Sequence, residues 1–188
     1  MDTQLQELIS RLDEHIENYQ KHTHTGADNT QQITGQAWNV LAQASLSSAA
    51  TSITTHVFTP KKVLRIEIYI NGKSSSTPEN LTFNGDVGNN YFYHVTGDNT
   101  STTSVPLSNT NNSNDIHSIV NVVNLQTNNK QFNYTTSLQS GSIAGSGSVV
   151  SGVGVYGNIT DQINKVKVAS STTETFAAGS FINVLGHD

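Results

Sequence analysis

The chain has 188 residues, enough for one domain of ordinary size and a short appendage. Its net charge is −5 and its nine Lys and Arg are scattered, so we do not expect nucleic acid as a partner. It contains no cysteine, which excludes disulfides and thiolate metal sites, and only 34% of its residues are hydrophobic, with a polar remainder that favours strands and turns.

Nothing in the sequence predicts contact with a membrane. No apolar stretch approaches the roughly 20 residues that span a bilayer. The N-terminus is polar and acidic, unlike the basic start and apolar core of a signal peptide. We therefore expect synthesis in a cytoplasm and release, if any, by lysis.

Residues 1–21 are predicted to form a short amphipathic helix. Apolar residues recur there at spacings of four, three, four and three, the a/d pattern of a coiled coil: Leu5, Ile9, Leu12, Ile16 and Tyr19. We interpret this segment as a helical oligomerisation stalk, and the alternative is a helix that lies on its own domain. Ile at a with Leu at d also suits dimers, so the heptads alone do not fix the number of chains.

Residues 22–55 are interpreted as a connector. The segment opens with the turn-rich sequence "HTHTGADNT" and continues with small, polar and weakly periodic residues. This pattern leaves two possibilities open, a short helix or an extended crossing.

Residues 56–188 are predicted to form a β head domain. The segment 63–70, "VLRIEIYI", alternates, which places Leu64, Ile66, Ile68 and Ile70 on one face. Residues 81–95 read as strand, hairpin turn, strand, and residues 96–115 as a long polar loop. Further strands are expected at 116–126, 131–138, 147–157, 163–170 and 180–186. Short strands separated by Asn, Gly and Ser clusters predict a mainly β fold, a jelly-roll-like antiparallel β-sandwich, and disfavour a parallel α/β enzyme fold.

The sequence offers weak signals for cofactor chemistry. "GVGVYG", residues 152–157, has the letters of a dinucleotide-binding motif, but no helix is predicted to open inside it, so we expect a strand whose glycines permit bulging or close packing. Asp86, Asn89 and Asn90 offer oxygens to Ca²⁺, yet they lack the spacing of an EF-hand and fit a turn. The dispersed carboxylates single out no catalytic pair. We therefore expect a protein that is not an enzyme.

The strongest candidate site is the pair His22 and His24. In extended backbone both side chains of an H-x-H pair point to the same side, and neutral imidazoles suit Zn²⁺, Fe²⁺ or Ni²⁺. Two ligands do not complete a site, whereas three chains around an axis would supply six nitrogens. We predict a structural transition-metal ion on a threefold axis; the alternative is that both histidines are exposed and bind nothing.

The segment "KHTHTGADNTQQI" resembles the H-x-H-x-G-x-D segments of bacteriophage fibre and virion-surface proteins, with matches at His22, His24, Gly26 and Asp28. Residues 81–94 and 173–186 also resemble stretches of phage-type β-sandwich domains. The resemblance implies a homotrimer in which H-x-H pairs from three chains ligate an axial metal ion. It also implies a place in the virion, among capsid or tail proteins, after synthesis in the cytoplasm of a bacterial host.

The chain has a single H-x-H pair and no long shaft, so a capsid decoration protein or short head fibre is the first expectation. The alternative is a short tail fibre or receptor-binding protein that recognises a host surface glycan, and a carbohydrate-active enzyme comes third. Tyr91, Phe92 and Tyr93 are candidates for glycan stacking, although alternation predicts that one or two of them belong to the core.

Overall fold

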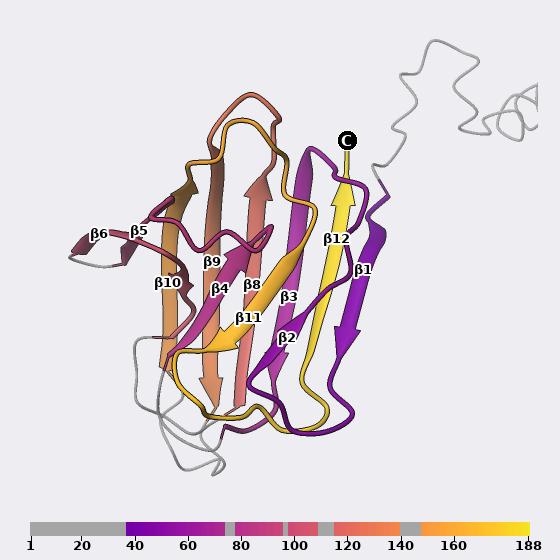
Figure 1. Ribbon diagram of the computed structural model, residues 1–188, viewed down its shortest axis with the longest axis vertical. Helices are drawn as coiled ribbons and strands as arrows, with labels where there is room; N and C mark the ends of the chain where they lie inside the picture. The colour runs from indigo at the N-terminus through magenta and orange to yellow at the C-terminus, as the bar shows by residue number, and fades with distance from the viewer. Residues whose placement is uncertain (1–36, 74–77, 96–97, 109–114, 140–147) are drawn as a thin grey trace, which may run out of the picture. The chain divides into compact units, whose positions relative to one another are not determined.

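The computed structural model describes residues 37–73, 78–95, 98–108, 115–139 and 148–188 (Figure 1). The described part of the chain contains strands and no helix, so the mainly β prediction is confirmed. It therefore contains no helix that could cross a membrane. Trp38–Asp188 is one compact unit. The predicted helix over residues 1–21 lies outside the described residues.

The strands form two antiparallel sheets. The larger has the order β1 (Asn39–Ser45), β12 (Phe181–His187), β3 (Val63–Ile70), β8 (Asp115–Val123), β9 (Lys130–Gln139), β10 (Ser148–Tyr156), β5 (Tyr91–Val95) and β6 (Asp98–Thr102). The smaller has the order β2 (Ser52–Thr54), β11 (Val166–Ser170), β4 (Glu79–Phe83) and β7 (Val105–Pro106). The smaller sheet lies across one face of the larger one (Figure 1).

Four of the pairings are nested in the sequence: β1 pairs with β12, β2 with β11, β3 with β8 and β4 with β7. Strands β5 and β6 are inserted between β4 and β7, and β9 and β10 between β8 and β11. Both insertions join the larger sheet on the side of β8, so the larger sheet has eight strands and the smaller has four.

One core joins the two sheets. The predicted alternation of β3 is confirmed, because Leu64, Ile66, Ile68 and Ile70 are fully buried while the residues between them are partly exposed. Phe83 of β4 and the valines of β11 belong to the same buried cluster. Each strand therefore gives alternate side chains to the shared interior, as facing sheets require.

Two polar regions of the sequence contain strands that were not predicted. Within the predicted connector the chain is extended, since β1 and β2 are strands, so the extended alternative holds there. The expected loop over residues 96–115 was wrong in part, because it contains β6 and β7. A polar edge strand needs only a backbone partner, which β5 supplies to β6, and Val105 and Leu107 are fully buried anchors beside β4.

The turn between β4 and β5 was predicted correctly, but the hairpin was not. Asn84 and Gly85 have φ of 57° and 73°, and the Asp86 N–H donates to the Phe83 carbonyl at 2.9 Å, as in a tight turn with two left-handed residues. The two strands nevertheless belong to different sheets. Both edges of β4 are occupied by β11 and β7, so the turn carries the chain from one sheet to the other.

The glycines of "GVGVYG" provide space for aromatic rings. Gly152 lies opposite Tyr134 and Gly154 opposite Phe132 on the neighbouring strand β9. A Cβ atom added to Gly152 would lie 2.5 Å from the Tyr134 ring, and one added to Gly154 would lie 2.3 Å from the Phe132 ring. The expectation of close packing is confirmed. Because β10 runs to Tyr156 without a helix, the segment is not a dinucleotide-binding turn.

Candidate binding groove

The metal-ligating and oligomerisation residues predicted from the sequence lie outside the described part of the chain. They are the metal ligands His22 and His24 and the oligomerisation residues Leu5, Ile9, Leu12, Ile16 and Tyr19. Among the described residues, no group of three or more His, Cys, Asp or Glu is placed to hold a metal ion. Both sets stay predictions.

The Asp86 carboxylate accepts hydrogen bonds within its own turn. Its Oδ1 accepts a hydrogen bond from the Gly88 N–H at 2.7 Å, and its Oδ2 accepts one from the Asn90 amide at 2.9 Å. Burial alone would raise the pKa of this carboxyl, but hydrogen bonds from Asn90, Gly88 and Tyr156 lower it below its usual value. The carboxylate and the Asn90 side chain thus hold the turn, which supports the turn over the Ca²⁺ interpretation.

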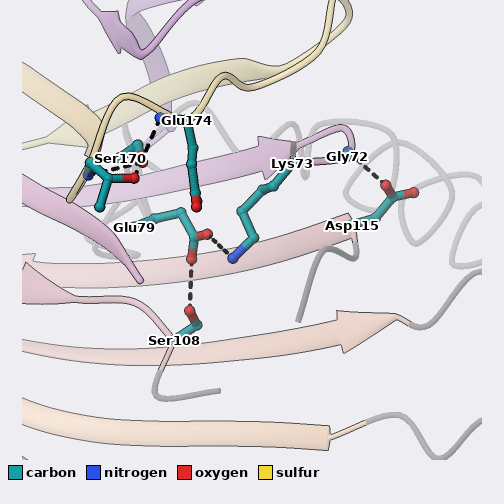
Figure 2. Close-up of polar contacts among 8 residues, drawn as sticks. Gly72, Lys73, Glu79, Ser108, Asp115, Ser170 and Glu174 are labelled. Carbon is teal, nitrogen blue, oxygen red and sulfur yellow. Dashed lines mark hydrogen bonds and ion pairs between the residues drawn. The ribbon is translucent and has the colours of Figure 1, made fainter. Parts of the chain in front are cut away.

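A buried ion pair joins Lys73, just after β3, to Glu79 at the start of β4 (Figure 2). The Lys73 ammonium contacts Oε1 of Glu79, and the Ser108 hydroxyl donates to Oε2 at 2.8 Å. The exposed fractions of the Lys73 and Glu79 side chains are 2% and 0%. Both carboxylate oxygens are occupied and closed to solvent, so the cluster ties the segment after β3 to β4 and to the segment after β7. We assign it a structural role.

The three aromatic candidates for stacking have different environments. Tyr91 is fully buried and stacks on Tyr156 with 4.9 Å between ring centroids. Tyr93 is partly buried against the core, whereas Phe92 is 56% exposed. The predicted alternation is confirmed, and Phe92 is the member of the three that can meet a partner.

Phe92 lies at one side of an open groove of about 610 Å³ on the outer face of the larger sheet. The groove runs over β5, β10, β9 and β8 to the start of β3. Its side chains are mostly apolar and amide groups, among them Phe92, Asn121, Val123, Gln131, Asn133 and Val153. The residues that line it include no Lys, Arg, Asp or Glu.

The strand register explains how these residues meet. Val63, Val123, Gln131, Val155 and Phe92 occupy one cross-strand row. The next row contains Asn121, Asn133, Val153 and His94, and the Asn121 amide donates to the Asn133 oxygen at 3.0 Å. Residues opposite one another across neighbouring strands share a face, so rows assembled from distant segments form one surface.

This groove was not predicted from the sequence, although the pattern of β10 contains a signal for it. Val149 and Val153 point outward on a strand whose inward positions include the buried residues Val150 and Tyr156. An antiparallel strand that is apolar on both faces differs from the ordinary alternation of a sheet with one wet face. Such a pattern indicates a second covered face.

No protein-family model matches this chain, and a search of curated proteins finds no match. The chemistry of the groove must therefore be judged from its own residues. An uncharged, largely apolar surface with a few amides suits an uncharged partner. Another protein surface and a neutral saccharide stacked on Phe92 both fit this description.

Proposed function

We propose that the chain is a non-enzymatic structural protein of a bacteriophage virion, a homotrimeric capsid decoration protein or short head fibre. In this proposal residues 1–21 form a helical stalk, His22 and His24 clamp an axial metal ion, and the β domain is a jelly-roll-like sandwich head. The protein would contact copies of itself and other virion proteins.

The observation that carries the proposal is the nested strand pairing of the head. Pairing of β1 with β12, β2 with β11, β3 with β8 and β4 with β7 is the pattern of a long hairpin rolled into two facing sheets. This pattern supports a jelly roll of eight strands, an architecture common in viral capsid proteins and lectins. Fold alone does not fix function. The resemblance of the H-x-H segment to phage fibre proteins points to the virion.

The alternative is a short tail fibre that recognises a host surface glycan. The exposed ring of Phe92, beside amide groups in an uncharged groove, favours this alternative. It requires the groove to be open to solvent in the assembled protein.

The location of the protein in purified phage particles tests the proposal. Particles from host cells that produce the encoding phage would be labelled with gold-conjugated antibody against the head and imaged, and their proteins quantified by mass spectrometry. We expect label on the capsid and copies in multiples of three. Label at the tail tip would favour the alternative, and absence from the particles would contradict both.

A further inference from the structure

The outer faces of the two sheets differ in chemistry. Among the residues that the structure describes, ten large hydrophobic ones are exposed, and six of these lie on or beside the outer face of the larger sheet: Trp38, Val40, Phe92, Val123, Val149 and Val153. The outward positions of the smaller sheet are instead polar or small, such as Thr54 on β2, Thr82 on β4 and Lys167 on β11. The same domain therefore has one outer face suited to water and one that is not.

The exposed apolar residues of the larger sheet gather at two places on its outer face. Val63, Val123, Val155 and Phe92 share one cross-strand row, and Val153 belongs to the next. At the opposite side of the sheet, Trp38 packs edge-on against His187 with 4.7 Å between ring centroids. A surface of this kind on a soluble domain marks an interaction site.

Several polar groups on this face have partners within it. Across neighbouring strands, the Gln43 amide donates to Asn183 at 3.1 Å and the Asn121 amide to Asn133 at 3.0 Å. Arg65 pairs with Glu67 along β3 at 3.1 Å. Groups that bond to each other in the plane of a sheet lose less when water leaves than groups that depend on water.

This pattern favours a second copy of the chain over a saccharide as the occupant. A saccharide site needs many donors and acceptors, whereas the groove lining is largely apolar, and Asn121 and Asn133 use one of their hydrogen bonds on each other. Around a symmetry axis identical faces approach one another, so like charges would repel. The groove lining carries no formal charge, although the whole chain carries −5.

The whole face is about as large as one partner's share of a standard interface. Eight strands about 4.8 Å apart, with strand lengths near 25 Å, give a face of roughly 900 Å². One partner in a standard interface buries about 800 Å². A face turned toward a threefold axis meets both neighbours, and its two halves then serve as the two unlike patches of a cyclic interface.

We infer that the outer face of the eight-stranded sheet is covered by the other copies of this chain in the assembled protein, with the groove between Phe92 and Val63 inside that interface. The inference rests on the proposed homotrimer and adds the surface through which the heads meet. It places Phe92 and Val153 out of reach of a glycan.

Single cysteines test the inference directly, because the natural chain has none. The full-length variants Val153→Cys and Thr54→Cys each place one thiol at a position that is exposed in the single chain, on opposite outer faces. Each would be labelled with a maleimide in the native state and again after unfolding in guanidinium, and the ratio removes differences in intrinsic reactivity. After this correction, we expect the native thiol at position 153 to react at least about tenfold more slowly than the thiol at position 54, because the interface must open before it reacts.

The outcomes separate the inference from the proposed trimer, because sedimentation of the same samples gives the mass. An oligomer in which both thiols react equally fast overturns the inference and leaves the trimer standing. A monomer overturns both. Fast labelling at position 153 that a neutral oligosaccharide slows overturns the inference in favour of the receptor-binding alternative.

A second pair of variants supports the result without thiols. Val123→Lys places an ammonium group on the apolar row, and Thr82→Lys makes the matched change on the other outer face. We expect the first to raise the concentration at which the oligomer dissociates by about tenfold or more, through repulsion of like charges and desolvation, and the second to leave it unchanged. Equal behaviour of the two variants, with both folded by circular dichroism, contradicts the inference.

Discussion

The Tyr134 hydroxyl is buried without a hydrogen-bond partner among the described residues. Burial raises the pKa of this phenol to about 12, so it stays neutral at physiological pH. A buried hydroxyl that makes no hydrogen bond costs the free energy of its lost hydration. Tyr134→Phe is therefore expected to raise the free energy of unfolding by about 1 kcal/mol, measured by urea denaturation.

Tyr91→Phe is the matched control, because it is the same chemical change at a hydroxyl that has partners. The Tyr91 oxygen accepts a hydrogen bond from the Phe83 N–H at 2.8 Å. Its loss is expected to lower the free energy of unfolding by about 1 kcal/mol or more, since the buried N–H is left unpaired. Two shifts in the same direction would show that the two environments do not differ as described.

Asp86 makes stability depend on pH. Because its pKa is lower in the folded chain than the ordinary value near 3.9, the unfolded chain binds the proton more readily. The carboxylate thus contributes stability that is present above about pH 4 and is lost as the pH falls through the folded value. We expect the stability difference between the natural protein and Asp86→Asn to shrink between about pH 5 and pH 3 in urea titrations. A difference that stays constant over this range would contradict the assignment.

At the scale of elements, the contact between β9 and β10 depends on glycine. A Cβ atom on Gly154 would lie 2.3 Å from the Phe132 ring and 2.5 Å from the Phe92 carbonyl oxygen, and the second group is backbone that cannot rotate away. Gly154→Ala is expected to lower the free energy of unfolding by about 2 to 3 kcal/mol, the upper range for overpacking. Ser151→Ala on the same strand, at an exposed position, is the control and should change it little. The check is thermal unfolding. If Gly154→Ala unfolds at the same temperature as the natural protein, the two strands have room to move apart and the prediction is wrong.

The elements that sequence could predict are those whose local pattern is decisive. β3, β8 and β12 alternate or run apolar between turn residues, and their predicted and observed positions agree. β6 was missed because it consists of Asp, Asn, Thr and Ser alone, and β7 because its two residues, Val105 and Pro106, stand in a polar stretch; pairing with β5 and β4 decides their conformation. Local pattern contains no information about which strand will be the neighbour.

The same limit applies to the candidate groove and to the buried ion pair. Asn121 and Val153 are 32 positions apart in a polar region of the sequence, and only the register of β8, β9 and β10 brings them together. Glu79 and Ser108 belong to different segments, with β5 and β6 between them. The exposure of Phe92 could be predicted from the sequence, because alternation within β5 places it on the opposite face from Tyr91.

At the scale of the whole molecule, the predicted stalk, metal clamp and head act together if three chains assemble. Sedimentation of the full chain should then give about 60 kDa, three copies of the 20.2 kDa chain. A monodisperse monomer at micromolar concentration would contradict this expectation.

The metal clamp is predicted to stabilise assembly and to leave no position for a substrate. Six imidazoles from His22 and His24 of three chains would fill an octahedral shell, and a closed shell has no open position for catalysis. An ion that binds the assembly and not the separate chains stabilises it, by roughly 2.7 kcal/mol at 100 times the dissociation constant. The ligands must be neutral, so this stabilisation is present above the ordinary histidine pKa of about 6.5 and fades as pH falls below about 6.

The variant with both His22→Ala and His24→Ala should melt at a lower temperature than the natural protein above pH 7, and the difference should vanish near pH 5. Elemental analysis should find close to one transition-metal ion per three natural chains and none in the variant. His94→Ala, at a histidine in the head, is the control and should keep the metal. If the natural protein has the same melting temperature with and without chelator and contains no bound metal, the metal clamp is wrong and both histidines are exposed residues that bind nothing.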